Sequence, residues 1–242
     1  MKILALESSA LAASVCLTED EILVAQFFQN SGLTHSKTLL PMAEQLLDSC
    51  GEKLEDVDVI AVAAGPGSFT GLRIGVSGAK GLAWALDKPC AKVSTLEAMA
   101  WNLSVCPGEL CPVMDARRGQ VYNARFSSNG ESITRLTPDR ALSLEELAQE
   151  LKNGAGPQIL VGDGAGLCYN YCRKEGLPVR VAPANLRFQS AWGVARAALD
   201  QARQGTLLTA EELTPEYHRL SQAERERLKR EQEQISKRTK GE

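Results

Sequence analysis

One continuous apolar run, from Val57 to Ala64, constrains the fold of this sequence more than any other feature. It ends at Gly65-Pro66-Gly67, and an uninterrupted apolar run that stops at a turn is typical of a strand buried on both faces. Such strands belong to sheets with helices on both sides. The chain therefore has to supply helices that cover this strand.

The segments around this run predict a defined order of elements. Three earlier apolar runs with turn-forming or acidic residues between them predict consecutive antiparallel strands, at Ile3 to Leu6, Ser14 to Thr18 and Ile22 to Phe28. Residues 36–50 predict an amphipathic helix, with Ser36 as its N-cap and Gly51 as its stop. The run 57–64 comes next, and a helix over 71–86, a strand near 90–93 and a helix over 95–104 follow. This order is ribonuclease-H-like.

Pro107-Gly108 interrupts the chain, and a similar order then restarts. The predicted strands are Leu110 to Met114, Gln120 to Phe126, Ser132 to Leu136, Gln158 to Val161 and Val179 to Ala182, and the predicted helices are 143–152, 164–175 and 189–204. We therefore predict an α/β protein with mixed sheets in two lobes, 1–105 and 106–215, with a cleft between them. A charged helix or tail over 216–242 completes the prediction.

Composition excludes several classes of protein. A net charge of -3 has the wrong sign for a chain that holds nucleic acid by itself. The apolar runs are too short to cross a membrane, no signal peptide is recognisable, and seven cysteines without a CxxC pair indicate a reducing cytoplasm. Two distant histidines, His35 and His218, and the lack of a GxSxG motif favour neither a metal centre nor a serine hydrolase.

Two segments carry candidate chemistry. The glycine-rich segment 65–73 lies between a buried strand and a helix, where free N–H groups could bind a phosphate or carboxylate; alternatively, Ser68 or Thr70 only caps the helix. Glu7-Ser8 and Asp115 each end the first strand of a lobe. They could hold Mg²⁺ or orient water as in phosphoryl transfer, or they could serve as turn caps.

The helix over 71–86 is apolar almost all round its circumference. Small residues at Gly71, Gly75 and Ala79 recur at helical spacing, and Leu72 and Leu82 occupy other parts of its surface. One side has to cover the sheet. The other side is covered either within this chain or by the helix over 36–50 together with a second protein chain.

Three segments carry a resemblance to a known family. MKILALESSA at the N-terminus, GPGSFTGLRIG at 65–75 and DARRGQVY at 115–122 are similar to the TsaB (YeaZ) family of tRNA threonylcarbamoyladenosine (t6A) biosynthesis proteins, and the similarity extends from residue 1 to about 220. The resemblance implies an ASKHA fold, that of the actin-like ATPases, with two ribonuclease-H-like lobes. One departure is His218 in the Pro215-Glu216-Tyr217-His218-Arg219 segment, where the family has an apolar residue.

The resemblance also implies a function and partners. It implies a non-catalytic scaffold for the TsaD subunit, which acts with TsaE to transfer threonylcarbamoyl to N6 of adenosine 37 in tRNAs that read ANN codons. The expected chain is cytoplasmic, holds no cofactor or metal, contacts tRNA only indirectly, does not bind a membrane, and forms a heterodimer with TsaD or a homodimer when alone.

The partner surface that the resemblance implies lies on the helices 36–50 and 71–86. Its expected residues are Leu39, Met42, Ala43, Leu46, Gly71, Leu72, Gly75, Ala79 and Leu82. Glu7, Ser8 and Asp115 are expected to line a vestigial nucleotide cleft. Two alternatives stay open: an independent ASKHA-type ATPase or sugar kinase, and an M22-type metallopeptidase, which the missing ligands disfavour.

Overall fold

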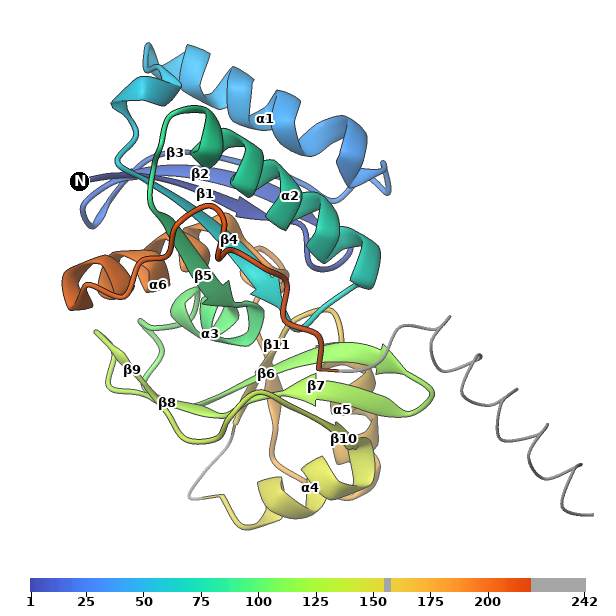
Figure 1. Ribbon diagram of the computed structural model, residues 1–242. Coiled ribbons are helices and arrows are strands. Elements are labelled where there is room, and N and C mark those ends of the chain that lie inside the picture. The colour runs from blue at the N-terminus through green and yellow to red at the C-terminus, as the bar shows by residue number, and fades with distance from the viewer. Residues whose placement is uncertain (155–157, 219–242) are drawn as a thin grey trace, which may run out of the picture.

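The computed structural model describes residues 1–154 and 158–218, and its first sheet confirms the predicted N-terminal order (Figure 1). The strands are β1 (Lys2–Glu7), β2 (Ala13–Glu19), β3 (Ile22–Gln29), β4 (Val59–Gly65) and β5 (Cys90–Ser94), in the spatial order β3-β2-β1-β4-β5. β1 runs antiparallel to β2, with Ala5 opposite Cys16, and parallel to β4, with Leu4 beside Ile60. Every residue of β4 is buried, as its apolar run predicts.

The second sheet repeats this arrangement. Its strands are β6 (Gly108–Arg117), β7 (Gln120–Asn123), β8 (Phe126–Ser128), β9 (Ile133–Arg135), β10 (Arg140–Ser143), β11 (Ile159–Val161) and β12 (Arg180–Val181). The main path is β10-β7-β6-β11-β12, and β8 pairs with β6 and β9. The central strand again has an antiparallel neighbour, β7, and a parallel one, β11.

Helices cover both sheets in layers (Figure 1). They are α1 (His35–Cys50), α2 (Phe69–Ala85), α3 (Thr95–Trp101), α4 (Leu144–Lys152), α5 (Ala165–Lys174) and α6 (Ala191–Gln204), with a short 3-10 helix, η1, at Leu54–Asp56. α1 and α2 lie side by side on the outer face of the first sheet, and α4 and α5 cover the outer face of the second. α3 packs between the sheets, because Ala98 and Trp101 join the core of the first while Leu96 and Met99 join that of the second.

Helix α6 packs on the first sheet, although it follows the second in the chain. Ala191, Val194, Ala195, Ala198 and Leu199 share a buried core with residues of β1, β2, β4 and β5. Gly193 lets α6 pack closely on α3 as well, since a Cβ at that position would overlap the carbonyl oxygen of Ala98. The chain therefore returns to the first sheet after residue 190, within the range predicted for the second lobe.

Several predicted details are wrong. Ser36 lies inside α1, whose N-cap is Thr34 without a side-chain hydrogen bond. The run Gln120 to Phe126 is divided between β7 and β8. Between these two strands, the backbone N–H of Arg125 donates a 2.8 Å hydrogen bond to the Thr137 hydroxyl. The edge strand β10 was not predicted. Gly51 does end α1 in a left-handed conformation, as expected.

Within the two described ranges, every helix is too short or too polar to cross a lipid bilayer. The predicted charged segment 216–242 lies outside the described residues from 219 onward.

Candidate functional site

The glycine-rich segment 65–73 connects β4 to α2 and packs against the loop at residues 8 and 9. The Ser68 backbone N–H donates a 2.6 Å hydrogen bond to the Ser9 carbonyl, and the Ser8 hydroxyl donates to the Gly71 carbonyl at 2.9 Å. A Cβ at Gly71 would overlap the Ser8 carbonyl oxygen. Ser68 caps α2, since its hydroxyl accepts from the Gly71 N–H at 3.4 Å. The glycines thus let α2 pack closely on residues 8 and 9, which supports the capping interpretation over an anion site.

The Glu7 carboxyl is buried at the end of β1. Its Oε1 accepts a 2.6 Å hydrogen bond from the Ser9 backbone N–H, whereas Oε2 is buried without a hydrogen-bond partner in the described part of the chain. Burial raises the pKa of Glu7 to about 7; the hydrogen bonds from Ser9 oppose this rise, and the nearby Asp163 carboxylate adds to it. Close to pH 7 this carboxyl is therefore partly protonated.

Asp163 belongs to the same cluster, although sequence reasoning did not select it. It follows β11 between two glycines, and a Cβ at Gly164 would lie 2.8 Å from the Met114 carbonyl carbon, so the loop packs tightly against β6. Gln189 Nε2 donates to Asp163 Oδ1 at 2.8 Å. Burial raises the pKa of Asp163, the Gln189 hydrogen bond lowers it, and the Asp115 carboxylate raises it further.

A third carboxyl group interacts electrostatically with both predicted cleft residues. The Asp163 carboxylate raises the pKa of Glu7, and the Asp115 carboxylate raises that of Asp163. Asp115 itself is exposed and caps its own turn, accepting a 2.6 Å hydrogen bond from the Arg117 N–H. In the described ranges, no group of three or more histidine, cysteine, aspartate or glutamate side chains is arranged to hold a metal ion. The Gly162-Asp163-Gly164 pattern after a strand was the signal that could have identified Asp163.

The expected partner-binding residues lie mostly inside this chain. Of the nine, Leu82 is half-buried and the others are buried: Leu39, Met42, Ala43, Leu46, Gly71, Leu72, Gly75 and Ala79. They point away from the outer surface because α1 and α2 turn these residues toward the sheet and the loop at residues 8 and 9. These eight residues therefore offer little surface to a second chain.

Residues on these helices and in the loop before α1 are exposed. Trp84 of α2 is 66% exposed, Leu40 of α1 46%, and Leu33, which precedes α1, 61%. Ser77 and Gly81 lie on the outward stripe of α2 with Trp84 and are also exposed. We call these five residues the α1–α2 face.

The C-terminal segment 206–218 packs across the first lobe and reaches α2. Cys90 and Leu208 exchange backbone hydrogen bonds of 2.7 and 2.8 Å, and the Glu216 N–H donates to the Ala64 carbonyl at 2.7 Å. The Tyr217 ring stacks on Phe69 with centroids 4.6 Å apart, and its hydroxyl accepts from Arg73 Nε at 2.9 Å. This segment therefore holds the start of α2 from the side opposite Ser8 and Ser9.

Comparisons with known proteins find a TsaD family model and relatives named TsaB. The family described as "TsaD: tRNA N6-adenosine threonylcarbamoyltransferase" matches residues 29–179. A "tRNA threonylcarbamoyladenosine biosynthesis protein TsaB" from Bacillus subtilis (strain 168) is 35% identical over 167 residues, 69% of this chain and 73% of the relative.

Solved structures give the same result. A Pseudomonas aeruginosa protein described as similar to peptidase YEAZ has a TM-score of 0.78 and 29% identity, covering 90% of this chain and 99% of that one. Component A of (R)-2-hydroxyglutaryl-CoA dehydratase from Acidaminococcus fermentans has a TM-score of 0.50 at 12% identity, covering 84% and 99%, which is a likeness of fold alone. With the repeated sheet order, these likenesses confirm the predicted ASKHA fold.

Proposed function

Because this chain belongs to the TsaB family and has a role in t6A biosynthesis, we propose that it is a non-catalytic subunit that binds TsaD. In this role it supports the transfer of threonylcarbamoyl to N6 of adenosine 37 in tRNAs that read ANN codons. TsaE acts through the complex of the two subunits, in the cytoplasm. When TsaD is absent, the same surface pairs two copies of this chain.

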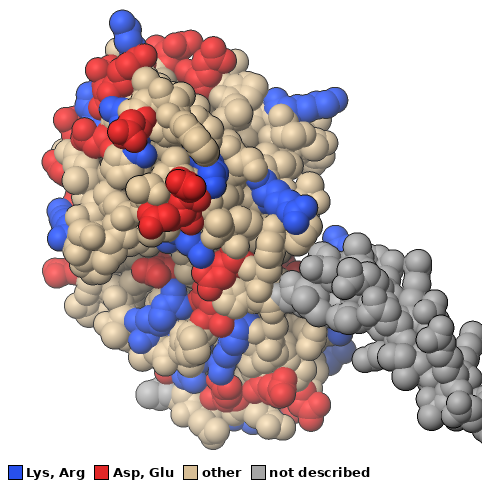
Figure 2. Space-filling view, viewed as in Figure 1, with Lys and Arg blue, Asp and Glu red and all other residues tan. Residues whose placement is uncertain are grey.

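The α1–α2 face is the observation that carries this proposal. A tryptophan that is 66% exposed, with two leucines of 61% and 46% exposure, leaves apolar area in water that a partner could bury. Figure 2 shows uncharged patches over α1 and α2, with charged side chains gathered beside them at the upper left. Aromatic side chains surrounded by uncharged residues are typical of the energetically dominant part of a protein interface.

The shape of this face suits a second helix. The Leu40 side chain lies over Gly78, where an added Cβ would be 3.3 Å from Leu40 Cδ2. Nothing lies within 4 Å of a Cβ added at Gly81. The small residues Ser77 and Gly81 therefore leave a depression on α2 next to Trp84, into which side chains of a partner helix can pack.

Charge supports an indirect role toward tRNA. The net charge is -3, and Lys/Arg and Asp/Glu side chains are interspersed over the visible face (Figure 2). Counterion release by clustered Lys and Arg supplies most of the affinity of proteins for nucleic acids, and a mixed surface gains little from it. We therefore assign the tRNA contacts of the complex to its other subunits.

The first prediction tests the α1–α2 face with Gly81→Arg. The arginine enters open space on the surface of α2, so the fold is retained while a partner helix is kept away. We expect at least tenfold weaker binding to purified TsaD and a matching loss of t6A formation in the reconstituted reaction. Gln149→Arg, at an exposed position of α4 in the second lobe, is the matched control and should behave as the wild type.

Wild-type TsaD binding by a folded Gly81→Arg variant would contradict the proposed surface. Substitutions at Gly75 or Ala79 are poor tests of an interface, because both residues are buried and their variants would damage the core. The non-catalytic role is tested separately with Glu7→Ala and Asp115→Ala, which should keep t6A formation. Loss of activity by either variant with normal TsaD binding would assign this chain a chemical step.

A further inference from the structure

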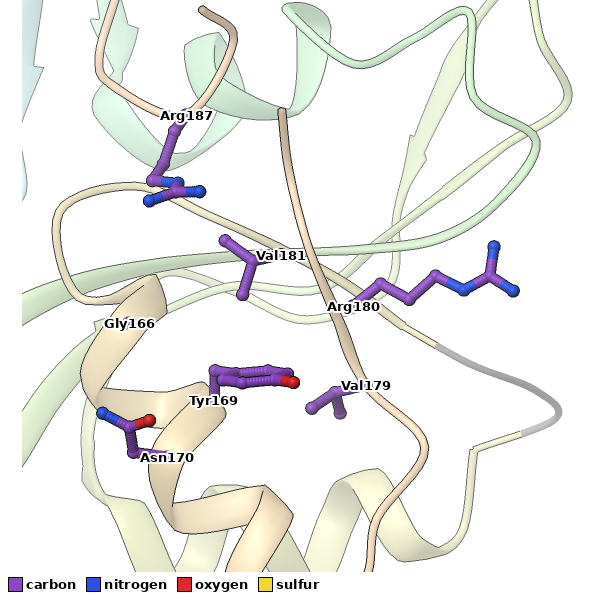
Figure 3. Close-up of a pocket in the computed structure, with 7 residues that line it drawn as sticks. All are labelled: Gly166, Tyr169, Asn170, Val179, Arg180, Val181 and Arg187. Atoms are coloured by element: carbon purple, nitrogen blue, oxygen red, sulfur yellow. The ribbon is translucent and has the colours of Figure 1, made fainter. Parts of the chain in front are cut away.

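A pocket of about 620 Å³ opens in the second lobe, between α5 and β12 (Figure 3). It lies far from the α1–α2 face, on the other sheet (Figure 1). Gly166, Tyr169 and Asn170 line it from one side of α5, since residues three and four positions apart share a helix face. The other lining residues are Val179, Arg180, Val181 and Arg187. The volume lies within the range of pockets that hold small molecules.

The lining combines one flat ring, two cations and an amide, with no acidic residue. The Tyr169 ring lies next to Val179 and Val181, and the Arg187 guanidinium enters from the opposite side of Val181 (Figure 3). Asn170 lies beside the ring on α5, and the Arg180 side chain extends outward at the rim. This set matches a ligand with a planar apolar part and an anionic group.

The walls of the pocket are held in place by the second-lobe core. The Arg180 N–H donates to the Gln158 carbonyl and the Ala182 N–H to the Leu160 carbonyl, both at 2.9 Å, which fixes β12 on β11. Val179 is buried, and Tyr169 and Val181 pack against the same core. The Arg187 carbonyl accepts from the Gly162 N–H at 2.7 Å. Binding would therefore order few additional groups.

Arg187 retains capacity to bind an anion. Its Nε and Nη2 each lie 3.4 Å from the Ala182 carbonyl oxygen, near the upper limit of a hydrogen bond, and Nη1 makes no hydrogen bond within the described ranges. These contacts orient the guanidinium but leave its donors largely available. A phosphate can use two parallel donors of one guanidinium, which strengthens and orients the contact.

We propose that this pocket binds a mononucleotide, with the base against Tyr169 and the phosphate on Arg187. The Asn170 amide, which carries a donor and an acceptor, can bond to the edge of the base. The proposal is independent of TsaD binding, because the residues that carry it lie on α5, β12 and the loop before α6.

The test uses the full chain and three probes, AMP, adenosine and inorganic phosphate, measured by calorimetry or amide NMR. AMP should bind at least tenfold more tightly than either adenosine or phosphate, because only AMP uses both the ring and the guanidinium. Gly166→Leu should weaken AMP binding at least tenfold, because no atom lies within 4 Å of a Cβ at Gly166 and the leucine would fill the pocket. Leucine also favours a helix more than glycine does, so this variant should fold.

Arg187→Gln should give a similar loss, and Arg173→Gln, at an exposed position of α5 outside the lining, is the matched charge control. Because Arg187 also contacts the Ala182 carbonyl, Gly166→Leu decides the result if Arg187→Gln proves unstable. The proposal is overturned if AMP does not bind at millimolar concentration, if phosphate or adenosine binds as tightly as AMP, or if Gly166→Leu binds AMP as the wild type does.

Discussion

At the scale of single residues, Glu7 is unusual because its carboxyl group is fully buried. An ionised carboxylate without water around it is costly unless hydrogen bonds or cations compensate, and only one Glu7 oxygen has a hydrogen-bond partner among the described residues. The fold therefore favours the neutral acid, and the pKa of Glu7 rises to about 7. The side chain that most resembled a catalytic carboxylate in the sequence is one that the fold keeps partly protonated near pH 7.

This shift predicts how stability depends on pH. The folded pKa of Glu7 is about 7 and the unfolded value is about 4.5, so the folded state binds the proton more tightly. The stability gained from the neutral acid is complete below pH 4.5 and is lost as the pH rises from 4.5 to 7, by about 3 kcal/mol in total.

Glu7→Gln should remove this loss, because the amide does not ionise. We expect the free energy of unfolding of the variant, measured with urea, to rise relative to the wild type between pH 5 and 7. The raised pKa of Asp163 acts in the same direction in both proteins, so it largely cancels in the difference. A difference that stays constant across this range would refute the assignment.

At the scale of elements, α2 contains both a tightly packed glycine and an exposed one, and replacing them with alanine should change the stability of the protein in opposite directions. A Cβ at Gly71 would overlap the Ser8 carbonyl oxygen, whereas a Cβ at Gly81 meets open space. Gly71→Ala should destabilise the protein by roughly 1–3 kcal/mol, because the backbone has to move. Gly81→Ala should stabilise it by up to about 1 kcal/mol, because alanine favours a helix more than glycine. Chemical denaturation of the two variants compares them directly, and equal effects would mean that α2 does not pack on residues 8 and 9 as described.

At the scale of the whole molecule, the first sheet depends on a helix from the far end of the chain. α6 buries six apolar side chains in the core of the first sheet, and residues 206–216 add backbone hydrogen bonds at β5 and β4. A fragment ending at residue 105 has no α6, so the sheet face that α6 covers would be exposed to water.

We therefore expect a fragment of residues 1–105 to lack a cooperative unfolding transition, as monitored by circular dichroism and amide NMR. The full chain serves as the reference. A fragment that unfolds cooperatively with dispersed amide signals would show that 1–105 is an independent folding unit, as the simplest form of the two-lobe prediction requires.

The sequence alone determined most of the order of elements and the C-terminal end of α1. Val57 to Ala64 predicted a strand buried on both faces, Gly51 ended α1, and the restart after Pro107 predicted a second sheet of similar order, because periodicity and turn residues are local properties of the chain. The hydrophobic pattern of the sequence did not predict β10, because its four residues form a strand only through pairing with β7. Of the candidate cleft residues, Glu7 and Asp115 were selected as strand ends.

Only the tertiary structure decided which faces and which groups meet. Gly75 and Ala79 were expected at a partner surface but are buried, because a helix that is apolar all round does not reveal which side faces its own sheet. Asp163 joins Glu7 and Asp115 because Gly164 packs β11 and its loop onto β6, a contact between residues about fifty positions apart in the chain. α6 covers the first sheet for the same reason: long-range packing is set by shape and by the burial of apolar surface, which local sequence does not encode.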